Sequence, residues 1–94
     1  MTDDARSFAL PPVPSHDDCN ALAQFLAASG AAAGTHIDAS AVHRCGALAA
    51  QLLVTGAEQA RAGGHDFAIQ AASDGFIASI RDLGLTEHLP IEGA

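Results

Sequence analysis

The sequence predicts one α/β domain with a small, mainly parallel β-sheet. Three short segments of strand character alternate along the chain with three segments of helical periodicity. Strands that alternate with helices are joined by crossovers, which leave the strands parallel. The 94 residues are 49% hydrophobic and 16% charged, which suits a folded chain with one modest core. We expect a flexible N-terminus at residues 1–6 and the domain at residues 7–94.

Local signals predict the first strand and the first helix. Residues 7–10 alternate as a half-buried strand does, and the prolines that follow permit only a short strand at a sheet edge. Ser15 is placed to cap a helix, and Asp18 stands at the reciprocal position of a capping box. Apolar side chains then recur at helical spacing, and Gly30 or Gly34 ends the helix.

The rest of the chain repeats this alternation. Residues 35–38 include two β-branched side chains and predict a central strand. A second helix is expected from about Cys45 to Ala62, where a pair of glycines closes it. Residues 66–70 predict the third strand. Ser73 then caps a third helix, which Gly84 ends.

The second helix is apolar around most of its circumference. On an ideal helical wheel Leu48 falls in the narrow polar arc, within roughly 20° of Thr55 and Gln59. Leu48 therefore either faces solvent or a partner, or leans onto the core beside Leu52, and the wheel permits both. The broad apolar arc likewise fits burial between a sheet and another helix, or an oligomer or partner contact.

Charge excludes several classes of partner. The formal net charge is −7 and the chain has only four cationic side chains, all arginines. No basic patch is available to neutralise phosphates, so we expect no nucleic acid and no anionic membrane surface as a partner. No apolar run reaches membrane-spanning length, and the N-terminus is acidic where a signal peptide is basic. The prediction is a cytoplasmic protein without direct membrane insertion.

The sequence contains no pattern typical of a catalytic or metal site. Its five histidines lack HxxxH or HExxH spacing and no CxxC pair is present, so we expect no metal and no cofactor. Cys19 and Cys45 are interpreted as small buried hydrophobes. His43 lies near Cys45 in sequence, but this spacing does not suggest the facing geometry of a catalytic pair. We expect a protein that is not an enzyme.

Two motifs resemble those of STAS domains, the family of sulfate transporters and anti-sigma factor antagonists. Ile37-Asp38-Ala39-Ser40-Ala41-Val42 is similar to their strand-and-turn signature, and the segment from Ser73 to Ile91 resembles their C-terminal signature. The resemblance covers roughly residues 7–92. It implies a STAS-like single domain, with a small mainly parallel or mixed sheet and helices mostly on one face.

The resemblance also implies a switch, which this sequence alters. Anti-sigma factor antagonists carry a phosphorylatable hydroxyl at the start of the second helix, where a phosphate disrupts the partner interface. Here the acidic position of that motif is Gly46, the hydroxyl positions are Ala47 and Leu48, and the following glycine is Ala49. Leu48 cannot be phosphorylated. Ser40 is the alternative hydroxyl, although a turn hydrogen bond is its simpler role.

A protein-binding regulatory module is the function that the resemblance implies. The expected partner is an anti-sigma factor, a histidine-kinase-like ATPase domain or a chemotaxis component, with a homodimer as a further candidate. The expected partner-binding surface consists of Asp38, Ser40, His43, Arg44, Gly46, Ala47, Leu48 and Gln51. The alternative is a small STAS subunit of a bacterial lipid-transport ABC assembly. That class keeps a hydroxyl and a glycine in the second-helix motif, so it ranks lower.

Overall fold

Strands and helices alternate as the sequence predicts. The computed structural model describes residues 6–28 and 34–91. The elements are β1 (Arg6–Ala9), α1 (His16–Ala28), β2 (Thr35–Asp38), α2 (Ala47–Gly63), β3 (Phe67–Gln70), α3 (Asp74–Asp82) and a 3₁₀ turn (Thr86–His88). The α/β class is confirmed.

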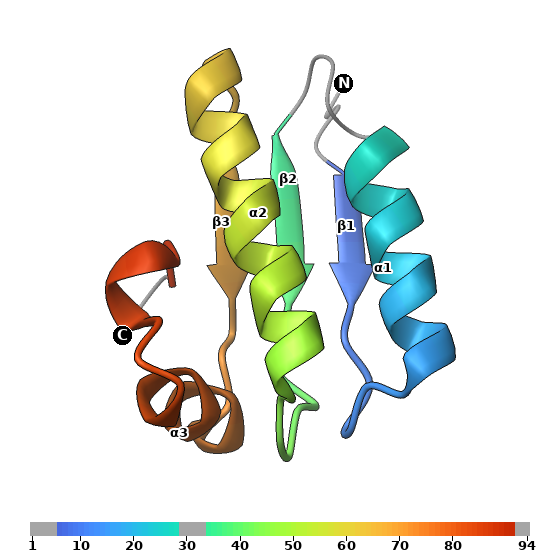
Figure 1. The fold of residues 1–94 in the computed structure, drawn as a ribbon, viewed down its shortest axis with the longest axis vertical. Coiled ribbons are helices and arrows are strands. Elements are labelled where there is room, and N and C mark those ends of the chain that lie inside the picture. The colour runs from blue at the N-terminus through green and yellow to red at the C-terminus, as the bar shows by residue number, and fades with distance from the viewer. Residues whose placement is uncertain (1–5, 29–33, 92–94) are drawn as a thin grey trace.

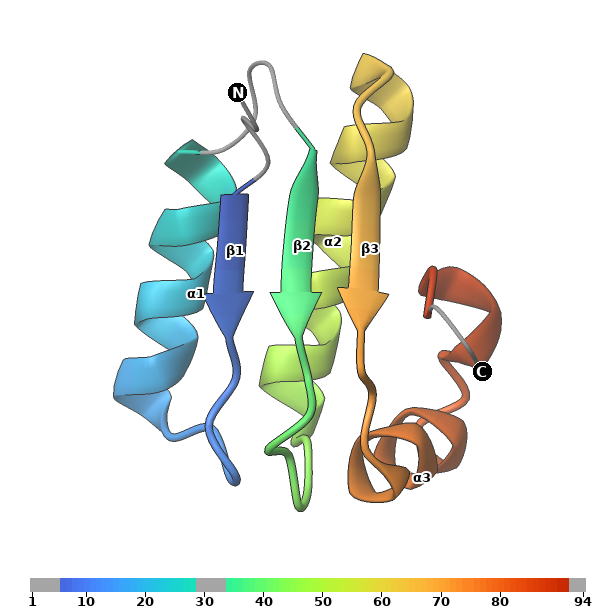
Figure 2. The same ribbon diagram turned by 180° about the vertical axis from the view of Figure 1, so that it is seen from behind.

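The three strands form one parallel sheet in the order β1-β2-β3, so β2 is the central strand as expected. Helices α1 and α2 cover the same face of the sheet (Figure 1), and no described helix covers the opposite face (Figure 2). Helix α3 lies beyond the carboxyl end of β3. The expectation of helices mostly on one face is therefore also confirmed.

The core lies between the sheet and this helical layer. Phe8, Ile37 and Ile69 are register partners across the sheet, and the last two are fully buried. Phe8 meets Phe25 of α1 with 5.2 Å between ring centroids. The apolar arc of α2 is largely buried at Ala49, Ala50, Leu53, Val54, Gly56 and Ala57. Core packing, rather than an oligomer contact, accounts for most of that arc.

The predicted helix ends are present in detail. The Asp18 amide donates to the Ser15 hydroxyl at 3.2 Å, and the Ser15 amide donates to the Asp18 carboxylate at 2.8 Å, which completes the capping box. Ser73 accepts from the Phe76 amide at 3.1 Å and caps α3. After α2, Gly64 adopts a left-handed conformation with φ of 76°, which favours glycine.

Several details differ from the prediction. β1 begins at Arg6, which was expected in the flexible terminus; residues 1–5 and Gly30 lie outside the described residues. α2 begins at Ala47 rather than Cys45, because Gly46 is the N-cap with an extended backbone and its carbonyl accepts a hydrogen bond from the Ala50 amide. Ile91 forms a parallel bridge to Ile69, so the expected tail extends the sheet beyond β3.

Candidate partner-binding surface

The predicted binding residues gather at one end of the molecule. They run from the end of β2 into the first turns of α2, at the carboxyl ends of the strands (Figure 1). Asp38 is half-buried, and the others are exposed: Ser40, His43, Arg44, Gly46, Ala47, Leu48 and Gln51. Leu48 is 53% exposed. It therefore lies on the surface, the first of the two orientations that the helical wheel permits.

Exposed apolar side chains mark this end. Val13, which follows β1, is 51% exposed and lies close in the chain to Pro12. Ala41 and Ala47 are exposed as well. Ala41 also borders a shallow depression, which is lined by Pro12, Ser40, Ala41, Val42, His43, Ser73, Asp74 and Gly75. We call the exposed residues between 38 and 51, together with Val13, the α2-entry surface.

Hydrogen bonds to the segment after β1 and to the end of β2 hold the loop that carries this surface. The Pro12 carbonyl accepts from the amides of His43 at 2.8 Å and Arg44 at 3.2 Å. The Asp38 carboxylate accepts from the Ser40 amide at 2.9 Å. Hydrogen bonds from the Ser40 amide and hydroxyl lower the pKa of Asp38, because they stabilise its ionised form. The carboxylate thus fixes the turn.

Helix α3 holds the same loop from the other side. The Ser73 hydroxyl donates to the Val42 carbonyl, and the Ser79 hydroxyl accepts from the Cys45 amide at 3.0 Å. A Cβ on Gly75 would lie 2.2 Å from the His43 carbonyl oxygen, so only glycine permits this close approach. Sequence reasoning assigned Ser73 only a capping role and missed Ser79 and Gly75. The one sequence signal that could have indicated the role of Gly75 was the presence of a glycine in the first turn of a predicted helix.

The two cysteines lie under this surface as protonated thiols. Both are buried. Burial, and secondarily the neighbouring Cys19, raise the pKa of Cys45 to about 11. Burial, and then the Asp18 carboxylate, raise the pKa of Cys19. Cys45 therefore does not supply a thiolate nucleophile at neutral pH, and His43 is exposed while Cys45 is not.

Ser40 has poor surroundings for a phosphate. Its amide and hydroxyl are engaged by the Asp38 carboxylate, and a phosphate dianion there would face that negative charge.

Within residues 6–28 and 34–91, no three His, Cys, Asp or Glu side chains cluster as metal ligands. No helix in the same ranges is both long enough and apolar enough to cross a membrane.

Comparison with known proteins identifies the family. A protein-family model described as "Mlab, STAS domain" matches residues 13–91, from the loop before α1 to the bridge that follows the 3₁₀ turn. None of the curated proteins matches the sequence significantly. The matched stretch contains both motifs singled out above and the whole α2-entry surface. The chain belongs to the STAS domain family.

Proposed function

We propose that this chain is a non-enzymatic, protein-binding regulatory module of bacterial signalling. It binds its partner through the α2-entry surface, in the manner of anti-sigma factor antagonists. The observation that carries this proposal is Leu48, an exposed leucine at the position where those antagonists carry their phosphoacceptor. An anti-sigma factor, a histidine-kinase-like ATPase domain or a chemotaxis component is the partner, and the complex forms in the cytoplasm.

The energetics of the α2-entry surface support binding. Burying the exposed half of a leucine side chain contributes about 1 kcal/mol from removal of apolar area alone, and Val13 adds a similar amount. The loop backbone is already bonded to Pro12, Ser73 and Ser79. Little ordering entropy is therefore lost on binding, which favours the complex.

Leu48 also changes how the contact is controlled. A leucine accepts no phosphate, so a kinase cannot introduce a dianion at this point of the interface. The contact is therefore constitutive or is controlled elsewhere. Sigma-factor partner switching and chemotaxis-linked regulation both fall within this proposal, because either would use this domain as a protein-binding module.

The test is the substitution Leu48→Glu. Once a partner has been isolated from the native bacterium, we expect this change to raise the Kd at least tenfold, because a charge would be buried without a counter-ion. The Tm should stay nearly unchanged, since Leu48 is on the surface. Calorimetric titration and thermal unfolding provide the two readouts.

Thr55→Glu is the matched control. Thr55 is exposed on the same face of α2, two turns further along the helix, and the substitution adds the same charge. It should leave the Kd unchanged. If Leu48→Glu unfolds the domain, or binds its partner as tightly as the Thr55→Glu variant does, the assignment of the surface is wrong.

A second candidate is a small STAS subunit of a bacterial lipid-transport ABC assembly. The observation that favours it is the matching family model, whose description names Mlab. The absence of a hydroxyl and a glycine at Leu48 and Ala49 counts against it. Copurification with a membrane ATPase would support this candidate, whereas a complex that contains no transporter would support the signalling module.

A further inference from the structure

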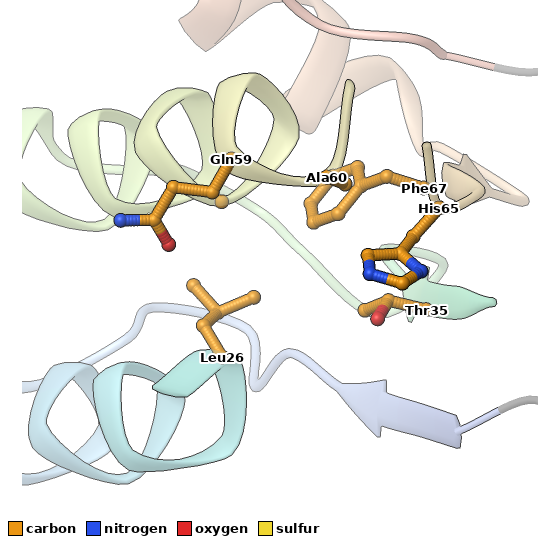
Figure 3. A pocket seen from close by; sticks show the side chains of 7 residues that line it. Leu26, Thr35, Gln59, Ala60, His65 and Phe67 are labelled. Carbon is orange, nitrogen blue, oxygen red and sulfur yellow. The ribbon is translucent and has the colours of Figure 1, made fainter. Parts of the chain in front are cut away.

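A cavity opens at the end of the molecule opposite the α2-entry surface. It lies among the end of α1, the last turns of α2 and the amino ends of β2 and β3 (Figure 1, Figure 3). Its volume is about 190 Å³, and its lining residues are Leu26, Thr35, Gly56, Gln59, Ala60, His65 and Phe67. We call it the Thr35 cavity.

Small residues on α2 form one side of this cavity. Gly56 and Ala60 are one turn apart on the helix and face the cavity between Leu26 and Phe67. A Cβ on Gly56 would lie 3.0 Å from Leu26 Cδ2 and 3.2 Å from Phe67 Cε2, so glycine at this point lets the two apolar walls approach the helix. Leu26 and Phe67 therefore form an aliphatic wall and an aromatic wall.

Polar groups without partners meet at the same cavity. Thr35 is 5% exposed and is the single buried polar residue in the described part of the chain. The Thr35 hydroxyl forms no hydrogen bond with any described residue. In the described part of the chain, every side-chain oxygen that is sealed from solvent has a hydrogen-bond partner. The hydroxyl therefore reaches the cavity.

Two further polar side chains line the cavity beside Thr35. The side chains of Gln59, which is exposed, and His65, which is half-buried, also form no hydrogen bond within residues 6–28 and 34–91, and solvent reaches both at the mouth of the cavity. Together the hydroxyl, the amide and the imidazole can both donate and accept hydrogen bonds. Because buried polar groups in proteins are ordinarily hydrogen-bonded, the unpaired hydroxyl of the buried Thr35 beside this space indicates a place for a ligand with its own polar group.

Size and charge define the class of ligand. An apolar cavity of roughly 150 Å³ holds benzene, so 190 Å³ accommodates one six-membered ring with a small substituent. The carboxyl end of α2 and the adjacent Asp66 make this region unfavourable for an anion, as does the net charge of −7. We propose that the Thr35 cavity binds a small neutral phenol, with its ring in contact with Leu26 and Phe67 and its hydroxyl at Thr35.

Phenol is the probe, with benzene and benzoate as comparisons. Titration of the full chain, followed by amide chemical shifts, should give saturable phenol binding with a Kd on the order of millimolar, as expected for so small a ligand. The shifts should centre on Gly56 and Phe67. Benzene should bind about fivefold more weakly because it makes no hydrogen bond, and benzoate should bind more weakly still.

Two variants and one control locate the site. Ala60→Leu fills the cavity and should abolish binding, whereas Ala62→Leu, on the exposed side of the same helix, should retain it. Thr35→Val keeps the shape of the side chain and removes its hydroxyl, so phenol and benzene should then bind equally. This second variant tests the site even if Ala60→Leu does not fold.

Several results would overturn the proposal. They are the absence of saturable phenol binding, which would mean that the cavity holds only water; binding that survives Ala60→Leu; and a preference for phenol that survives Thr35→Val. The Leu48→Glu variant should bind phenol as the unaltered chain does. Failure at this cavity can therefore be distinguished from failure of the proposed partner contact.

Discussion

The two ends of the sheet are built in opposite ways. At the carboxyl ends of the strands, Pro12, Ser73 and Ser79 tie down a loop that presents exposed apolar side chains such as Leu48. At the amino ends, α2 terminates through a backbone glycine cap at Gly64, and polar side chains around the Thr35 cavity have no partners among the described residues. Specific hydrogen bonds hold the loop where the surface is apolar, whereas the buried Thr35 hydroxyl has no described partner where the interior is hollow. One end is therefore suited to a protein contact, and the other to a small ligand.

The largest effect should follow from Gly75→Val. The added side chain would meet the His43 backbone, where even a Cβ would lie 2.2 Å from the carbonyl oxygen, so the α2-entry loop must move away from α3. We expect a loss of about 2–3 kcal/mol in the free energy of unfolding, as for other overpacked sites. Urea denaturation measures it.

Gly46→Ala is the control for this substitution. Gly46 lies on the same loop with φ of −75°, and a Cβ there would meet nothing within 4 Å. The Gly46→Ala variant should lose less than about 1 kcal/mol in the free energy of unfolding, the usual range for a change at a helix N-cap. Equal losses in the two variants would mean that α3 does not hold the loop.

A smaller effect is expected from Ser79→Ala. This change leaves the amide of the buried Cys45 without its acceptor and should destabilise the domain by about 1–2 kcal/mol. Hydrogen exchange should accelerate at the Cys45 amide beyond the change in global stability.

The comparison variant lies at the opposite end. Gly64→Ala forces a Cβ into the left-handed conformation and should lower stability by a similar amount, about 1 kcal/mol. In the Gly64→Ala variant, hydrogen exchange at the Cys45 amide should accelerate only by the amount that the loss of global stability accounts for. If both variants accelerate exchange at Cys45 equally, the two ends of the molecule are not independent.

The smallest effect concerns the stability of the fold at acidic pH. The pKa values of Asp18 and Asp38 are lowered by hydrogen bonds from Ser15 and Ser40, and both carboxyl groups lie at the carboxyl end of the sheet. A lowered folded-state pKa stabilises the fold above the ordinary value of 3.8, and this stabilisation is lost as pH falls through the folded-state value.

Denaturation midpoints measured from neutral pH to below 3.8 test this expectation. Asp18→Asn should flatten the acid limb of the curve. NMR titration of the two carboxyl groups provides the direct reading, and ordinary pKa values for both would contradict the expectation.

Short-range signals account for the parts of the fold that the sequence predicted well. The capping box at Ser15 and Asp18, the cap at Ser73 and the glycine after α2 each depend on residues within four positions of one another. The alternation of strands and helices required a parallel sheet, because each crossover returns the chain in the same direction. The positions of the predicted binding residues followed from this order, since all of them lie between the end of β2 and the first turns of α2.

Only the tertiary structure decided which side chains lie at the surface and what meets across the fold. The helical wheel permitted two orientations of Leu48, and the packing of α2 on α1 and the sheet selected the exposed one. The approach of Gly75 to His43, the bond from Cys45 to Ser79 and the bridge from Ile91 to Ile69 each join residues far apart in the chain. The Thr35 cavity likewise draws its walls from four separate segments. Such contacts depend on how whole elements pack together, so local sequence patterns do not encode them.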